Sequence, residues 1–244
     1  MKKLLAFLLG LAVAFYLISF LFTGPVSAAK DEVKLRVFVH YPKPQGKPVI
    51  DPCTATTNDQ IADYSLAGWT MPIEGMTYKI NYGTKPKNLT NDQVYTAISK
   101  SFATWTTADS KQIFNNGGFT IVKAAKFDGT NAVLFKGINA NAIAITYIWY
   151  YTATKQLAEA DTVFNNVYKW SHTAYDGTND CGGVANTFDV QNIGTHEFGH
   201  WVGLDDLYTT ADKDLTMYGY GDTAELKKDT LGTGDILGVN TVTP

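Results

Sequence analysis

The chain has 244 residues, of which 45% are hydrophobic and 18% are charged, as is typical of a folded protein rather than a disordered one. Its formal net charge is −3 and the sequence contains no cluster of basic residues, so nucleic acid is not an expected partner. The length beyond an N-terminal leader is sufficient for one domain with a substantial core.

Residues 1–29 have the pattern of a targeting segment. Lys2 and Lys3 precede an uncharged apolar run over residues 4–22, and small residues around Ala28 follow it. This order predicts a signal peptide. The apolar run is also long enough to span a bilayer, so an uncleaved membrane anchor is the alternative. Either way we expect a protein that is secreted or anchored to the outer face of the cytoplasmic membrane, with membrane contact through this segment alone.

The chain contains two cysteines, Cys53 and Cys181. In an oxidising compartment two widely separated cysteines usually pair, so we expect a disulfide between them. The alternative is that the Cys53 thiolate binds a metal and keeps the protein latent.

The elements expected in chain order alternate between strands and helices. A strand is predicted at residues 34–41, then a proline-rich loop, then a strand at 77–82. Thr90 and Gln93 form a capping-box pattern that begins a helix ending near Thr107. The helix places six residues on one buried face, namely Val94, Ala97, Ile98, Ser101, Phe102 and Trp105.

Further strands are predicted at residues 119–123, 132–135, 141–151 and 158–165. A second helix is expected to begin near residues 186–189 and to continue to Gly203. Strands interspersed with long helices in this order predict an α+β fold with a mixed, twisted sheet.

The most informative stretch is Thr195–Asp206, which has the form H-E-x-x-H-x-x-G-x-x-D. On a helix, His196 and His200 are four residues apart and therefore face the same side, where both can bind one metal ion. Glu197 is placed to act as general base on a water bound to that metal. Gly203 can end the helix in a left-handed conformation, which brings Asp206 back as a third ligand. Three protein ligands leave one position open, as in catalytic zinc sites.

Other metal-binding residue types are assigned no ligand role. Asp205 adjoins Asp206, but Asp206 has the spacing of the third ligand, so Asp205 is expected to be a solvated or hydrogen-bonded neighbour. His40 and His172 have no partner at metal-ligand spacing and are not expected to bind the metal.

The stretch from His196 to Asp206 resembles the metzincin metalloprotease signature, in the variant of small secreted bacterial proteases of the snapalysin type, where Asp replaces the third His. Residues 214–220 are similar to the Met-turn of that clan. Residues 230–239 resemble the start of the closing helix of matrixins, and residues 159–165 resemble the last strand of the matrixin sheet.

The resemblance implies a metzincin-type catalytic domain over residues 75–244. An upper subdomain, 75–203, would hold the twisted sheet and two long helices above a zinc cleft, and a small lower subdomain, 204–244, would close it. The strand at 142–151 would be the sheet edge that lines the cleft and pairs with an extended peptide. Residues 30–74 form an N-terminal extension that matches nothing in this family.

The resemblance also implies roles for single residues. Met217 would form an apolar floor under the histidines, and Tyr218 or Tyr220 would stabilise an oxyanion or line the cleft. Calcium is a second candidate cofactor beside Zn²⁺, because four acidic residues crowd one loop region: Asp205, Asp212, Asp214 and Asp222.

The expected function is therefore a zinc-dependent endopeptidase, a monomer with a protein or peptide substrate. One alternative is a zinc hydrolase of non-peptide amides, such as cell-wall material. The other is a non-catalytic surface binding protein of the same fold, against which the intact Glu197 argues, because a binding module needs no general base.

Overall fold

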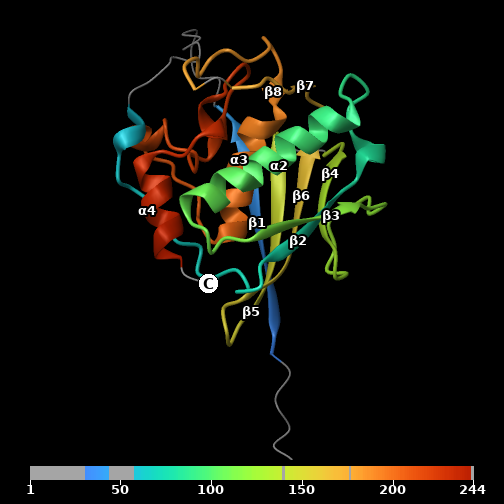
Figure 1. The fold of residues 1–244 in the computed structure, drawn as a ribbon, viewed down its shortest axis with the longest axis vertical. Coiled ribbons are helices and arrows are strands. Elements are labelled where there is room, and N and C mark those ends of the chain that lie inside the picture. Colours follow the sequence, from blue (N-terminus) through green and yellow to red (C-terminus); the bar gives the residue numbers. More distant parts are fainter. Residues whose placement is uncertain (1–30, 44–57, 139–140, 176, 243–244) are drawn as a thin grey trace, which may run out of the picture. The chain divides into compact units, whose positions relative to one another are not determined.

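The computed structural model describes residues 31–43, 58–138, 141–175 and 177–242. These residues form an α+β fold in which the longest helices lie across one face of a mixed sheet (Figure 1). The sheet has seven strands in the order β3-β2-β4-β6-β5-β1-β9, and a second sheet pairs β7 with β8. In the described part of the chain, no helix is long and apolar enough to cross a membrane; the predicted leader at 1–29 lies outside that part.

The strands are β1 (Val33–Pro42), β2 (Met76–Ile80), β3 (Phe114–Phe119), β4 (Asn131–Lys136), β5 (Ala144–Tyr151), β6 (Leu157–Asn165), β7 (Trp170–Ser171), β8 (Phe188–Asp189) and β9 (Tyr220–Gly221). The α-helices are α2 (Asn91–Ala108), α3 (Val190–Val202) and α4 (Thr233–Thr241). Short 3₁₀ helices are η1 (Asn58–Gln60), η2 (Tyr82–Thr84), η3 (Thr210–Asp212) and η4 (Lys227–Asp229).

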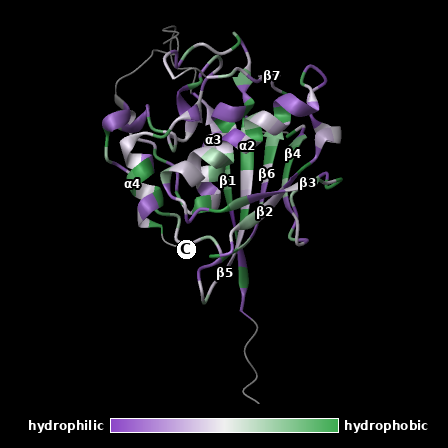
Figure 2. Ribbon diagram, in the orientation of Figure 1, coloured by the Kyte–Doolittle hydropathy of each residue, from purple (hydrophilic) through white to green (hydrophobic). Residues whose placement is uncertain are grey.

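Helix α2 begins as its sequence predicts. The Thr90 side chain accepts a hydrogen bond from the Gln93 amide, and the Gln93 side chain accepts one from the Thr90 amide, so the capping box is complete. All six residues predicted for its apolar face are buried. The ribbon of this helix carries both hydrophilic and hydrophobic colours in Figure 2, and its buried residues form the apolar face.

A stack of aromatic rings joins α2 to α3 and to the sheet. The Phe102 ring lies parallel to that of Phe198 on α3, with centroids 3.7 Å apart, and 4.3 Å from that of Tyr78 on β2. Both helices are thereby held on the same sheet face, and the position of α3 fixes the position of the His196–His200 motif that it carries.

Helix α3 ends where predicted. Gly203 has φ 104°, a left-handed conformation that residues with a side chain avoid. A Cβ atom at this position would also lie 2.4 Å from the Trp69 carbonyl oxygen. Position 203 therefore requires a glycine for two independent reasons. The chain reverses there, and the reversal returns Leu204–Asp206 towards the helix.

Two expectations about strands are wrong. The stretch 142–151 is not the sheet edge, because β5 pairs antiparallel with β6 on one side and with β1 on the other. The predicted strand at 119–123 is also absent from the described residues, and β3 instead covers the preceding stretch Phe114–Phe119. That strand contains two asparagines and two glycines, so neither its composition nor its periodicity signals a strand.

The N-terminal extension contributes to this same body. The compact unit runs from Glu32 to Pro244. Eight residues of β1 pair with β5, from Val33 opposite Tyr151 to His40 opposite Ala144. Further along the extension, Trp69 donates a hydrogen bond to the His200 carbonyl oxygen at 3.0 Å. Part of the extension that matched nothing in sequence thus packs around the predicted metal site.

We predict that Thr90→Ala lowers the free energy of unfolding by about 1 kcal/mol, because it removes the oxygen that caps α2. Thr107→Ala is the matched control, since Thr107 is exposed near the other end of the same helix. Urea denaturation of both variants measures the difference. Equal stability of the two variants would contradict a role for the capping box.

Candidate metal centre

Three side chains meet where α3 and the chain after Gly203 face each other. The ligand-type atoms of His196, His200 and Asp206 all lie within 4.8 Å of one another. His196 Nε2 is 3.2 Å from Asp206 Oδ1, and His200 Nε2 is 3.6 Å from the same oxygen. The structure therefore brings together the three residues that the motif spacing singled out.

These distances suit a shared zinc ion. Two ligand atoms about 2.1 Å from zinc at a tetrahedral angle are about 3.4 Å apart. His196 Nε2 and Asp206 Oδ1 are also buried and have no hydrogen-bond partner among the described residues. Buried polar atoms without partners are costly, and a cation between them would satisfy both. The donor set thus fits the group that the motif implies.

Backbone carbonyls fix which nitrogen of each histidine faces the site. His196 Nδ1 is 2.8 Å from the Thr216 carbonyl oxygen, and His200 Nδ1 is 2.9 Å from that of Leu204. A carbonyl oxygen can only accept, so each Nδ1 carries the proton and each Nε2 keeps its lone pair. This arrangement is the usual outer shell of a metal-binding histidine.

The charge states also favour a dication. Burial lowers the pKa of His196 to about 4 and lowers that of His200, so both rings are neutral at pH 7. Burial acts to raise the pKa of Asp206, but the two histidines and the Tyr208 hydroxyl beside it bring that pKa down to about 2. Neutral imidazoles and an ionised carboxylate are the forms in which these groups bind metals.

Glu197 lies beside this group with each oxygen engaged. Its Oε2 accepts a hydrogen bond of 2.5 Å from Thr146 Oγ1, and its Oε1 is 3.2 Å from His40 Nδ1. Burial raises the pKa of Glu197 to about 8. A carboxylate with such a pKa holds a proton more readily than an exposed one, which suits a group that accepts and returns protons.

Thr146 and His40 were not predicted as site residues. Thr146 on β5 lies opposite Thr162 on β6, their hydroxyls are 2.8 Å apart, and Trp201 Nε1 donates to Thr162 at 3.0 Å. This chain of donors orients the Glu197 carboxylate. A threonine among the buried positions of an apolar strand was the available signal for Thr146.

His40 has no such signal in the sequence. It lies on β1, 156 positions before His196 in the printed sequence, and its ring centroid is 3.8 Å from that of His196. His40, His196 and Glu197 form a second group whose ligand-type atoms lie within 4.8 Å of one another. The expectation that His40 is not a ligand remains a prediction, but the residue belongs to the site.

Met217 packs directly under the helix that carries the histidines. A Cβ atom at Gly199 would lie 2.1 Å from Met217 Sδ, so the thioether contacts the helix backbone between His196 and His200. The turn around Met217 is held by Asp235, whose carboxylate accepts hydrogen bonds from the amides of Thr216, Met217 and Gly232. Asp235 was not predicted as part of the site.

A buried lysine binds the same turn. Lys228 is fully buried, and its ammonium group donates to the carbonyl oxygens of Thr216 and Tyr218 on either side of Met217. Burial lowers the pKa of Lys228 to about 8. Because Thr216 O also accepts from His196 Nδ1, one carbonyl oxygen links the turn, the lysine and a candidate metal ligand.

Tyr208, which was not predicted as a site residue, is hydrogen-bonded to the candidate ligand set, and the roles predicted for Tyr218 and Tyr220 stay predictions. The Tyr208 hydroxyl donates to Asp206 Oδ2 at 3.1 Å. A Cβ atom at Gly219 would lie 2.4 Å from the Tyr208 ring, so this ring fills the space of a side chain at 219. Tyr218 and Tyr220 lie nearby, each half-buried, with ring centroids 5.5 Å apart.

Asp205 is engaged elsewhere. Its Oδ2 accepts a hydrogen bond of 2.6 Å from Arg36 Nη2, while its Oδ1 accepts from the Asp206 amide. The two groups of three ligand-type residues found in the described chain are those given above, and neither contains His172, Asp212, Asp214 or Asp222. Calcium therefore stays an untested prediction.

Cys181 takes part in a disulfide bond. The other cysteine of the sequence, Cys53, lies outside the described residues.

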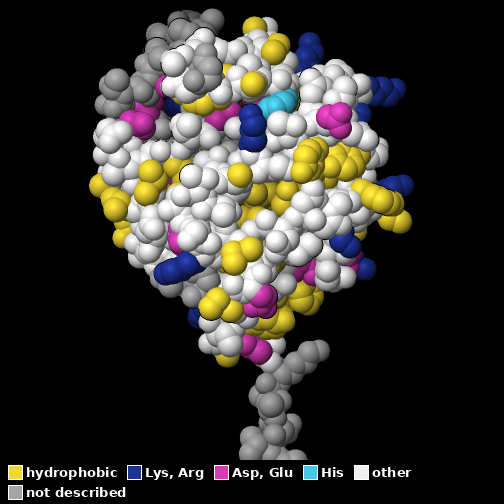
Figure 3. All heavy atoms as spheres, viewed as in Figure 1, with side chains coloured by type: hydrophobic (Ala, Val, Ile, Leu, Met, Phe, Trp, Pro, Cys, Tyr) yellow, Lys and Arg dark blue, Asp and Glu magenta, His cyan; other side chains and the backbone are white. Residues whose placement is uncertain are grey.

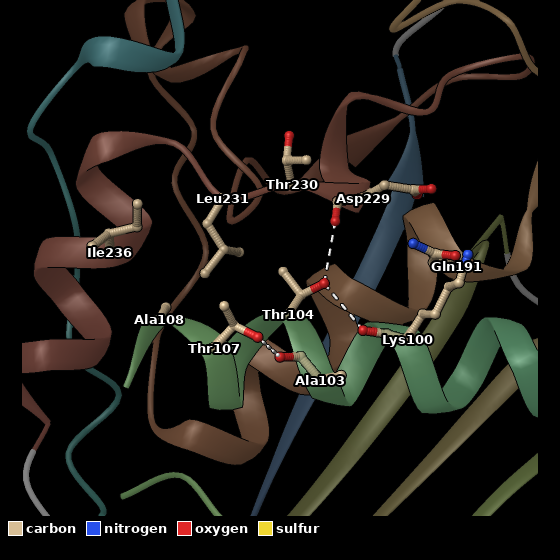
Figure 4. A pocket seen from close by; sticks show the side chains of 10 residues that line it. All are labelled: Lys100, Ala103, Thr104, Thr107, Ala108, Gln191, Asp229, Thr230, Leu231 and Ile236. Atoms are coloured by element: carbon tan, nitrogen blue, oxygen red, sulfur yellow. Dashed lines mark hydrogen bonds between the residues drawn. The ribbon is translucent and has the colours of Figure 1, made fainter. Parts of the chain in front are cut away.

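A pocket of about 520 Å³ lies apart from these residues, between α2, α4 and η4 (Figure 4). Its wall includes Asp229, whose carboxyl oxygens are buried without a hydrogen-bond partner among the described residues. Burial raises the pKa of Asp229 to about 9, so this group is neutral at pH 7. The pocket shares no lining residue with the metal centre.

No protein-family model and no curated protein matches the chain. The function of the chain is consequently inferred from the geometry of the site. On the molecular face drawn in Figure 3, charged side chains of both signs are interspersed among apolar and uncharged ones.

We predict that Asp235→Asn loosens the Met217 turn, because an amide nitrogen would replace one of the two oxygens that accept three backbone N–H groups. The expected loss in free energy of unfolding is about 1–3 kcal/mol, since a buried donor loses its acceptor. Asp92→Asn, on the exposed first turn of α2, is the control. Thermal and urea unfolding measure both, and a loss no greater than the control's would argue against this role for Asp235.

Proposed function

We propose that the chain is a zinc-dependent hydrolase of the metzincin type that cleaves peptide bonds. The observation that carries the proposal is the convergence of His196 Nε2, His200 Nε2 and Asp206 Oδ1 in a buried position, with the Glu197 carboxylate beside them. Zinc in such a site supplies a Lewis acid that lowers the pKa of a water and polarises a carbonyl group.

The chain's own residues would move the protons. Glu197 takes a proton from the attacking water and delivers it to the nitrogen of the leaving amine. Thr146 holds Oε2 of the Glu197 carboxylate, so Oε1, which contacts His40 Nδ1 in the described arrangement, is the oxygen that would act on the water. The hydrogen bonds to Thr216 and Leu204 hold the two imidazoles in the orientation that the ligand set requires.

A peptide substrate is supported by the backbone that lies over the site. Strand β1 is extended, antiparallel to β5, and places Phe38 and His40 against the histidines. The space next to β5 therefore accommodates an extended polypeptide. Location outside the cytoplasm follows from the predicted leader at 1–29 and remains part of the proposal.

Glu197→Gln should reduce peptide hydrolysis by about 10²–10⁴-fold, because an amide cannot accept the proton from water. Zinc content should stay unchanged, since Glu197 is not among the three proposed ligands. Digestion of a peptide library, with and without a chelator, together with metal analysis, tests this. Glu74→Gln, at an exposed position, serves as the control. Unchanged hydrolysis by Glu197→Gln would refute the proposed mechanism.

Asp206→Ala should weaken zinc binding far more than Asp205→Ala. Asp206 Oδ1 faces both histidines, whereas Asp205 pairs with Arg36. Zinc affinity, measured by competition with a chromophoric chelator, should fall by at least about tenfold for Asp206→Ala, the lower limit seen for altering even an outer-shell group. Equal affinities in the two variants would refute Asp206 as the ligand.

A further inference from the structure

The proposed catalytic residues are covered by a strand of the chain itself. His196 and Glu197 are 0% exposed and His200 is 1% exposed. A peptide that is to be cleaved must reach Glu197 and the space between the histidines. The described arrangement therefore leaves no room for a substrate at the site that would act on it.

Strand β1 is what covers them. Its Phe38 ring lies parallel to the His200 ring with centroids 3.8 Å apart, and its His40 ring is 3.8 Å from that of His196. His40 Nδ1 also contacts Glu197 Oε1, the oxygen that Thr146 leaves free. Two alternate residues of one strand thus contact all three motif residues.

Strand β1 is held mainly on one side. Residues 33–40 pair with β5, whereas the pairing with β9 involves only Tyr41 and Pro42. On the face turned away from the site, Leu35 and Val37 are 50% and 42% exposed. Removing β1 would break its eight-residue ladder with β5 and its two-residue pairing with β9, and would leave the pairing of β5 with β6 in place.

We propose that β1 is a displaceable internal ligand of the substrate groove, and that the chain with β1 in place is latent. This inference rests on the proposed function, because it assigns the space under β1 to the substrate. Once β1 leaves, β5 presents a free edge to which an extended peptide can add as a strand.

The contacts of β1 also indicate which peptides fit. The Phe38 ring is stacked on the His200 ring and meets the Trp69 ring edge-on, and the Arg36 guanidinium is 4.6 Å from its centroid. Arg36 in turn pairs with Asp205. An extended peptide with a basic residue two positions before an aromatic one reproduces both contacts, because alternate side chains face the same side. We therefore assign peptides with this pattern as the substrate class of the groove that β1 occupies.

The test combines a cut with a lock in the full-length chain. A recognition sequence for a site-specific protease is inserted after residue 46, so that cleavage separates β1 from the rest of the chain ahead of Cys53. The lock is Val37→Cys with Tyr147→Cys, which are opposite each other in the register of β1 and β5. Both positions face away from the histidines by strand alternation, and a cross-strand disulfide there would hold β1 in place.

Four protein forms are compared: cut and uncut, each with and without the lock. The readouts are hydrolysis of a peptide library and the rate at which EDTA removes zinc. We expect the cut, unlocked form to gain at least about tenfold in both, as for a state populated at 10% or less before release. The cut, locked form should gain only after a reductant is added, with the unlocked form in the same reductant as control.

The two readouts separate the two proposals. Zinc removal that follows this pattern without hydrolysis in any form would leave the internal ligand supported and the peptidase refuted. Zinc removal at one rate in all four forms would overturn the internal ligand, whatever the hydrolysis shows.

Hydrogen exchange on the unmodified protein provides a measurement that does not depend on the variants folding. Amides of β1 should exchange faster than those of β6, because release of β1 alone needs less free energy than global unfolding. Exchange of β1 and β6 only in a single cooperative opening would also overturn the proposal.

Discussion

One ring nitrogen each of His196 and His200 and one carboxylate oxygen of Asp206 are held close together in a buried position. The residues around these three atoms maintain that arrangement. An unpaired carboxylate in such a place is costly unless a positive charge lies beside it. Burial keeps the two histidines neutral, so the rings themselves do not supply that charge. A divalent cation bound between these atoms would supply that charge.

The elements that maintain this constraint come from distant parts of the chain. Helix α3 sets the spacing of the rings, Gly203 reverses the backbone, and the Met217 turn supports the helix from below. Asp235 and Lys228 stabilise that turn with opposite charges, one accepting from its amides and the other donating to its carbonyls. The fully buried Lys228 ammonium group also offsets part of the negative charge of the Asp206 carboxylate.

Local patterns in the sequence were sufficient to predict the helix features that depend only on neighbouring residues. The capping box at Thr90, the apolar face of α2 and the left-handed residue at Gly203 are all decided within a few residues, and the structure confirms each. The same holds for the α+β class, which follows from the order of strands and helices.

Long-range pairing could not be predicted in this way. Strand β1 was expected, but nothing in residues 34–41 shows that it pairs with β5, more than 100 positions later, and thereby removes the expected sheet edge. His40 reaches the site only through such placement, 157 positions before the Glu197 that it contacts. The side chains that surround the motif residues are therefore a product of topology, whereas the motif residues themselves are a product of helix periodicity.

The pairing of β1 with β5 has a consequence for the behaviour of the protein in solution. Strand β5 contains four aromatic residues, Tyr147, Trp149, Tyr150 and Tyr151. An unpaired edge of this composition is a template for self-association, and proteins generally cover or charge such edges. Strand β1, with Lys34 and Arg36, provides both a cover and positive charge. Strand β1 therefore also protects the sheet from aggregation, and a protein from which β1 had been displaced would need another strand at this edge for the same protection.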